Sequence, residues 1–289
     1  MSAVTTLQAR IPYKPKIKVG RILLYIVFIL VTLVFISPII WVFLTSLKLQ
    51  SEYSIYPVVI IPKPLQWINY KRALFDYPYF RYFWNSVKLA IPTTAITVLS
   101  SALAGFAFAR LEAPFKRILF ILVLSMLMVP RMVTAIPNFM LFAKLGLVDT
   151  YYPWYLWALS GSSFHIFLFR QFFSTIPKDL EDAAEVDGCN RFRIFWQIFL
   201  PLSGPVVATS AIFHFQWAWG DWFTPQIFLS ELKTTLSVFL ARSYPDPKGL
   251  PLETVTFAGV MIYLLPMLII FFIAQKYIVQ GVVTTGLKG

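Results

Sequence analysis

The sequence has few charged side chains, and acidic ones are the scarcest. Charged residues make up 13% of its 289 residues, whereas an average soluble domain has about 25%. Hydrophobic residues reach 58%, and the mean hydropathy is +0.70. A chain of this composition cannot hide its apolar surface in one aqueous core. This excludes an ordinary soluble domain and makes the lipid bilayer the expected solvent.

Residues that bind metals or carry redox chemistry are also scarce. The one cysteine, Cys189, excludes an intrachain disulfide and leaves a metal cluster without thiolate partners. Both histidines, His165 and His214, lie in apolar stretches and have no second ligand at helical spacing. The chain contains no Gly-x-x-x-x-Gly-Lys-Ser/Thr sequence, so ATP would have to be bound by another protein. We therefore expect no catalytic residues, no metal site and no cofactor in this chain.

What the sequence does contain is long apolar stretches, each near the roughly 20 residues that a helix needs to cross a bilayer. Six of them cover residues 22–46, 89–109, 118–143, 150–169, 205–229 and 254–275. They are too long and too continuously apolar for barrel strands. Aromatic residues, at 18%, suit helices that end at membrane interfaces. The sequence thus predicts an all-α polytopic membrane protein with six transmembrane helices.

Lysine and arginine indicate how these helices are oriented. Residues 1–20 are basic, and placing them in the cytoplasm gives the cytoplasmic segments more Lys and Arg than the outer ones. The positive-inside rule then predicts that both termini are cytoplasmic. The net charge of +12 is explained by this topology, and because the cations form no single patch we expect no nucleic-acid partner. We divide the chain into a basic tail (1–20), a membrane domain (21–276) and a C-terminal tail (277–289).

The few acidic residues of the chain are concentrated in residues 179–188. Five of these residues are acidic, and the segment contains Leu180, Ala183 and Ala184 at the spacing of one apolar helix face. Pro177 suits the first helical turn, and acids near that end are favoured by the helix dipole. Gly188 suits a left-handed stop after the helix. The segment predicts a short charged helix on the cytoplasmic side.

A second short helix is predicted directly after the first. Asn190 is a suitable N-cap, and Leu200-Pro201 marks the end. Four aromatic residues are expected on one side, along the membrane interface: Phe192, Phe195, Trp196 and Phe199. A solvated connecting loop is the simpler interpretation of such a segment. We favour a docking surface for another protein, because small Ala residues allow close approach and the acids oppose the positive-inside trend.

At these residues the sequence resembles a known family. Asp182-Ala183-Ala184, then Gly188, then Ile198-x-Leu200-Pro201 is similar to the cytoplasmic signature of permease subunits of binding-protein-dependent ABC importers. Asp182 stands where that family more often has Glu. Other stretches resemble the second permease subunit of maltose-type carbohydrate importers, namely 85–86, 128–130, 136–137, 167–173, 217–225 and 281–289.

This resemblance implies a type I ABC importer permease fold in a bacterial inner membrane. It implies four kinds of partner: a related second permease, two cytoplasmic ATPase subunits that bind ATP and Mg²⁺, an external solute-binding protein and membrane lipids. The cytoplasmic loop of about residues 174–204 is expected to contact the ATPase, and residues 284–289 to reach it as well. The expected coupling residues are Glu181, Asp182, Ala183, Ala184, Asp187, Gly188, Leu200 and Pro201.

For a substrate pathway, polar and aromatic residues within the apolar stretches are the candidates. Tryptophans could stack on sugar rings and polar groups could bind hydroxyls, although interface tryptophans and interhelical hydrogen bonds would give the same pattern. The candidates are Ser162, His214, Gln216, Trp217, Trp219 and Asp221. Arg131 is a further outlier, since a charge within a span is expensive and often functional.

The expected substrate is a di- or oligosaccharide, with a glycerol phosphate or a polyol as the alternative. A secondary transporter is a third possibility, but it would be expected to carry carboxylates at the membrane midplane, and the apolar stretches contain no Glu.

Overall fold

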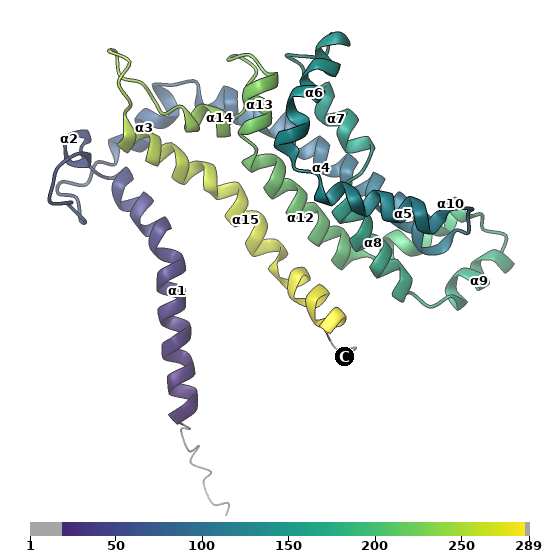
Figure 1. Cartoon of the computed structure of the whole chain (residues 1–289). Helices are drawn as coiled ribbons and strands as arrows, with labels where there is room; N and C mark the ends of the chain where they lie inside the picture. The colour runs from purple at the N-terminus through teal and green to yellow at the C-terminus, as the bar shows by residue number, and fades with distance from the viewer. Residues whose placement is uncertain (1–18, 287–289) are drawn as a thin grey trace, which may run out of the picture.

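The computed structural model describes residues 19–286, with side chains placed for residues 20–275. Within this range every regular element is a helix, apart from one isolated β-bridge between Pro245 and Pro251 (Figure 1). This confirms the all-α prediction. The basic tail predicted for residues 1–20 falls almost wholly outside the described range, as do the side chains of the predicted tail 277–289.

Three helices are long and apolar enough to span a membrane on their own in the described part of the chain. They are α1 (Val19–Ser46), α4 (Tyr79–Arg110) and α15 (Glu253–Gly286). Helix α1 extends away from the other helices over most of its length (Figure 1), and its apolar side chains are exposed. Such a surface is compatible with a lipid environment.

Helix α4 begins ten residues before the predicted start at residue 89. Hydropathy places its first turns outside the membrane, but two polar residues there, Asn85 and Ser86, are buried and hydrogen-bonded. Asn85 Nδ2 donates to the carbonyls of Leu232 and Thr234 at 3.1 and 3.0 Å, and Ser86 Oγ accepts from the Leu236 amide at 2.9 Å. Tertiary hydrogen bonds therefore extend the helix beyond its apolar stretch.

The predicted third span, residues 118–143, is not one straight helix. Helix α5 (Lys116–Ser125) and the 3₁₀ turn η1 (Met126–Met128) are followed by α6 (Arg131–Lys144), with a bend of 101° between the two arms. The bend lies at Val129-Pro130, where Val129 is extended, as the residue before a proline prefers. This break places Arg131 in the first turn of a new helix.

Two other predicted spans are also interrupted. The fourth consists of α7 (Tyr152–Leu159) and α8 (Ser163–Thr175), separated at Gly161, which has φ +74°. The fifth consists of α12 (Gly204–Gly220) and the short α13 (Phe223–Phe228). By length and composition the described chain has up to five spans. This number counts residues 116–144 as one bent span and residues 191–220, with a bend of 81° before α12, as another. The predicted six are therefore not confirmed.

Helix α4 contacts α7, α8 and α12, whereas α15 contacts α1, α3 (Ile68–Phe75) and α12. The crossing of α4 with α8 is close because Gly105 has no side chain: a Cβ there would lie 2.6 Å from the Cβ of Phe169. Short helices close the end of the bundle opposite α9 (Figure 1), namely α2 (Gln50–Tyr53), α3, α13 and α14 (Leu236–Ala241). We call this the α13 end and the other the α9 end.

Candidate functional site

The acidic segment forms helix α9 (Asp179–Val186) at one extremity of the molecule (Figure 1). Asp179, Glu181 and Asp182 lie in its first turn, as predicted. Pro177 lies just before the helix, because Lys178 is the N-cap and its carbonyl accepts from the amides of Glu181 and Asp182. The prediction that Pro177 occupies the first helical turn is therefore wrong by two residues.

The buried face of α9 differs from the predicted apolar stripe. Glu181 is 3% exposed and Ala184 is also buried, whereas Leu180 is 44% exposed and Ala183 lies on the outer side. The carboxylate of Glu181, and not Leu180, therefore faces the protein. A buried carboxylate is stable only when it is paired and hydrogen-bonded.

Two arginines provide that pairing. Arg191 Nη1 contacts Glu181 Oε1 and also lies 2.6 Å from Glu185 Oε1. Arg110, at the end of α4, has its Nε 3.8 Å from Glu181 Oε2, which is an ion pair but is longer than a hydrogen bond. Arg110 Nη2 donates to the carbonyls of Phe173 and Ile176. Glu181 thus joins α9 to α4, to the end of α8 and to the helix that follows.

The turn after α9 has the predicted geometry. Gly188 has φ +80°, and its amide donates to the Glu185 carbonyl at 3.0 Å. The next amide, of Cys189, donates to the Ala184 carbonyl at 2.9 Å, which closes the helix end. Asn190 then caps the second helix, with its Oδ1 accepting from the Arg193 amide at 2.8 Å.

The second helix is built from α10 (Arg191–Ile194), a π-helical turn η2 (Phe195–Phe199) and α11 (Leu200–Leu202). Its aromatic residues do not share one side. Phe195 and Phe199 are fully buried against Phe106 and Phe173, whereas Phe192 and Trp196 are exposed. The π turn changes the angular spacing of the side chains, which the α-helical prediction did not include.

The predicted coupling residues therefore fall into two groups. One group anchors the segment: Glu181 and Ala184 are buried, and Leu200 is partly buried. The other group is exposed and consists of Asp182, Ala183, Asp187, Gly188 and Pro201. The exposed group presents small and acidic side chains that another protein could contact.

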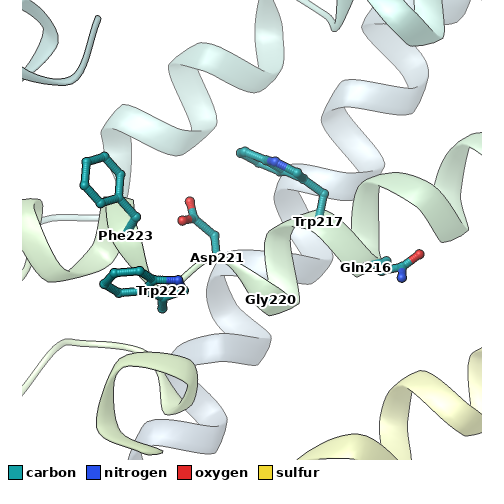
Figure 2. Close-up of a pocket in the computed structure, with 6 residues that line it drawn as sticks. All are labelled: Gln216, Trp217, Gly220, Asp221, Trp222 and Phe223. Atoms are coloured by element: carbon teal, nitrogen blue, oxygen red, sulfur yellow. The ribbon is translucent and has the colours of Figure 1, made fainter. Parts of the chain in front are cut away.

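A pocket lies toward the α13 end, where α12 stops. It has a volume of 330 Å³ and is lined by Gln216, Trp217, Gly220, Asp221, Trp222 and Phe223. In Figure 2 the carboxylate of Asp221 points into the space between Trp217 and Phe223, while the amide of Gln216 points away from it. The pocket therefore combines aromatic surfaces with one inward carboxylate.

Asp221 is only partly satisfied within the described part of the chain. Its Oδ1 accepts from the Thr224 amide at 3.1 Å, and its backbone carbonyl accepts from Ser237 Oγ at 2.8 Å. Its Oδ2 is buried without a hydrogen-bond partner there. Buried polar atoms are usually paired, so this one calls for an explanation.

Arg131 lies beside this pocket because of the break at Pro130. Its guanidinium carbon is 3.7 Å from the centre of the Trp217 ring, a cation–π contact between α6 and α12. Among the described residues, its side chain makes no hydrogen bond or ion pair. The sequence marked Arg131 as unusual, but only the bend of the third span shows which residue it contacts.

Three other pathway candidates do not line the pocket. Trp219 is 2% exposed, and its Nε1 donates to the Tyr263 carbonyl at 3.2 Å. His214 is buried, with Nε2 3.3 Å from Thr97 Oγ1. Ser162 precedes α8, and its amide donates to Ser101 Oγ at 3.0 Å. These contacts fit interhelical packing. No group of three His, Cys, Asp or Glu residues with metal-binding geometry occurs in the described residues.

Comparison with known proteins agrees with the signature around Gly188. The family model described as "Binding-protein-dependent transport system inner membrane component" matches residues 97–284. The arabinooligosaccharides transport system permease protein AraQ of Bacillus subtilis (strain 168) is 34% identical over 282 residues, or 96% of this chain and 99% of that protein. The lactose transport system permease protein LacG of Rhizobium radiobacter is 32% identical over 278 residues, which cover 96% and 97% of the two chains.

Two further matches extend this result. The sulfoquinovosyl glycerol transport system permease protein SmoH of Agrobacterium fabrum (strain C58 / ATCC 33970) is 30% identical over 254 residues, covering 87% of this chain and 88% of that protein. Among solved structures, a chain of a bacterial ABC transporter involved in the import of the acidic polysaccharide alginate gives a TM-score of 0.79 at 22% identity. That match covers 92% of this chain and 99% of the other. It confirms the importer permease fold.

Proposed function

The chain belongs to the family of binding-protein-dependent transport system inner membrane components, and we propose that it is one permease subunit of an ATP-driven carbohydrate importer. The carbohydrate assignment is supported by relatives named for arabinooligosaccharides, lactose and starch degradation products. A di- or oligosaccharide is the substrate we propose, and both termini would be cytoplasmic.

In this proposal the chain performs no chemistry itself. It pairs with a related second permease, and the two together line the pathway. Two separate ATPase subunits bind ATP and Mg²⁺, and an external solute-binding protein delivers the substrate. The lack of a P-loop sequence in this chain supports the assignment of ATP binding to separate subunits.

The anchoring of α9 through Glu181 is the single observation that carries the coupling proposal. Helix α9 is small, yet its buried carboxylate ties it to Arg110 of α4 and to Arg191 of α10. The exposed side chains of Asp182, Ala183 and Asp187 remain free to contact the ATPase. A movement of the ATPase surface would then displace α9 together with the ends of α4 and α8, because the network links them.

The pocket around Asp221 supports a pathway role for this end of α12. Sugars present apolar ring faces and many hydroxyl groups. Trp217 and Phe223 offer aromatic surfaces. Asp221 Oδ2, which has no partner among the described residues, would accept a hydroxyl hydrogen once a movement of the pocket exposes it. Displacement of the Arg131 guanidinium from Trp217 would free that ring for stacking.

Transport by the complete importer in proteoliposomes tests the proposal. We expect uptake of a labelled di- or oligosaccharide that requires the solute-binding protein outside and ATP inside. Uptake of only a polyol or a glycerol phosphate would contradict the carbohydrate assignment but would agree with the assignment as an ATP-driven importer. Uptake by this chain alone, driven by an ion gradient without ATP, would show a secondary transporter instead.

A further inference from the structure

A second pocket lies near the α9 end, among helices α4, α5 and α8. It has a volume of 580 Å³ and is lined by Phe108, Lys116, Arg117, Phe120, Ile121 and Arg170. Three of these side chains are cationic and none is acidic. The importer proposal gives this pocket no role.

The cations of this pocket lack the acidic partners that the nearby arginines have. The guanidinium carbon of Arg170 is 4.1 Å from the centre of the Phe120 ring, and its Nε donates to the Phe108 carbonyl at 3.4 Å. Lys116 Nζ donates to the Leu111 carbonyl at 2.7 Å. Arg117 is exposed. Among the described residues none of the three forms an ion pair, whereas Arg110 and Arg191 are paired with Glu181.

The surroundings of the pocket are apolar and face outward. Ile118, Ile121 and Leu122 of α5 are each at least 54% exposed. Lys116 and Arg117 occupy the first turn of α5, which opens one of the two bent candidate spans. A ligand that fits this surface needs an anionic group and an apolar part beside it.

We propose that this pocket binds the headgroup of an anionic phospholipid. The phosphate would lie among Lys116, Arg117 and Arg170, and the acyl chains would lie along the exposed apolar face of α5. Guanidinium groups bind phosphate oxygens through paired hydrogen bonds, and basic pockets between transmembrane helices are known to hold anionic lipids. An acidic protein surface would match the charges but would leave the apolar face uncovered.

Native mass spectrometry of the complete, delipidated importer tests this proposal. Phosphatidylglycerol is titrated against phosphatidylcholine with matched acyl chains, and the lipid retained by each complex is counted. We expect phosphatidylglycerol to be retained preferentially, and Arg117→Gln to weaken its binding about five-fold, because the phosphate in the pocket loses one of its three cationic partners. Arg117→Lys keeps the charge and should keep most of the preference.

Arg21→Gln is the matched control, since Arg21 is an exposed cation at the start of α1, outside this pocket. It should leave phosphatidylglycerol binding unchanged. The proposal is overturned if both phospholipids bind alike, or if the two glutamine variants lose lipid equally. It is also overturned if Arg117→Gln releases a protein subunit with no loss of lipid, because the pocket would then be a protein interface. Inorganic phosphate at the same concentration should not displace the lipid.

Discussion

Glu181 at the α9 end and Asp221 toward the α13 end combine a buried carboxylate oxygen with nearby arginine, but the two pairs are arranged differently. The Glu181 carboxylate has Arg110 and Arg191 within 4 Å. Asp221 Oδ2 has no partner among the described residues, and Arg131 stacks on Trp217 instead. The first arrangement fixes α9 relative to α4, to the end of α8 and to α10. The second leaves polar groups available to a ligand or to another conformation.

The largest effect is expected at Glu181. Glu181→Gln would leave Arg110, whose side chain is 12% exposed, without its anion. Removing one partner of a fully buried ion pair costs about 3–5 kcal/mol, and we expect about 2–3 kcal/mol here because Arg191 is half exposed and keeps Glu185. Transport should fall sharply while the protein still inserts. Hydrogen exchange of the α9 amides should increase.

Glu185→Gln is the control for that variant. Glu185 is 39% exposed and contacts only the half-exposed Arg191 among the described cations. Its removal should therefore change the free energy of opening of α9, measured by hydrogen exchange, by less than about 1 kcal/mol. Equal effects of the two variants would contradict the view that the buried carboxylate of Glu181 anchors α9.

Gly188 is expected to have the next largest effect. A Cβ there would have no atom within 4 Å, so the problem for Gly188→Ala is the positive φ, a strain of about 1–2 kcal/mol. Gly188→Arg adds a bulky group to the surface that we assign to the ATPase. We expect the arginine variant to insert normally but to lose transport, and the alanine variant to retain part of it.

Gly249 provides a matched control because it has φ +81° and also has open space around its Cβ position. Gly249→Ala should cause similar strain in the 245–251 loop and leave ATPase coupling unchanged. If Gly188→Ala and Gly188→Arg reduce transport equally, backbone strain alone explains the effect, and a contact with the ATPase at this turn is not needed.

Asp221→Asn tests the pocket with little change in shape. The amide oxygen can still accept from the Thr224 amide, so the turn should persist. If the free carboxylate oxygen binds a sugar hydroxyl, uptake at low substrate concentration should fall about ten-fold, equivalent to 1.4 kcal/mol. A double-mutant cycle with Arg131→Gln measures whether the two charges act together. Additive effects on uptake would show that they do not.

Substitutions of Trp217 and Trp219 in α12 should distinguish a residue of the substrate pathway from a residue of the packed core. Trp219→Phe removes the hydrogen bond to the Tyr263 carbonyl and should lower the free energy of unfolding by about 1 kcal/mol, with an unchanged KM for uptake. Trp217→Phe weakens the cation–π contact with Arg131 and should change the KM for uptake, with little effect on thermal stability. Both variants are compared by thermal denaturation and by uptake. The assignment is wrong if Trp217→Phe lowers stability without changing KM and Trp219→Phe does the opposite.

The smallest effect is expected at Asp149, in the loop before α7. The Ser230 amide, donating to Asp149 Oδ1 at 2.8 Å, lowers the pKa of this carboxyl, and Lys233 adds to the shift. The stabilisation is therefore present above the ordinary pKa near 4 and is lost as the pH falls through the lower folded value. Since Asp149 is 40% exposed, Asp149→Asn should cost at most about 1 kcal/mol at pH 7. The difference from wild type should shrink at low pH.

The sequence predicted the apolar helices and the signature turn well, because both depend on local chemistry. Gly188 and Asn190 act through their own backbone and neighbours, so their roles could be predicted from type and spacing. Arg131 and Asp221 were identified as charges that interrupt the third and fifth apolar stretches, but the extent of the bend beside Arg131 and the break at Gly161 were not predicted. Hydropathy averages over a window and does not register the single Pro130 or Gly161 that bends or interrupts the chain.

The roles of particular side chains were harder to predict because they depend on distant partners. Glu181 and Asp182 are adjacent acids, and only the position of Arg110, 71 residues earlier in the numbering, makes one buried and the other exposed. Arg131 contacts Trp217 only because the third span bends. Trp219 is in the core because its ring stacks on Phe215 and Tyr263.

Retention of the ATPase by the purified complex tests the central claim most directly. Wild-type importer is purified in mild detergent through this chain, alongside Asp182→Arg, which reverses one exposed charge on α9 without touching the Glu181 network. We predict that the wild type retains its ATPase subunits and that Asp182→Arg loses them while keeping the second permease. A variant that retained the ATPase and full sugar uptake would contradict the assignment of α9 as the docking helix.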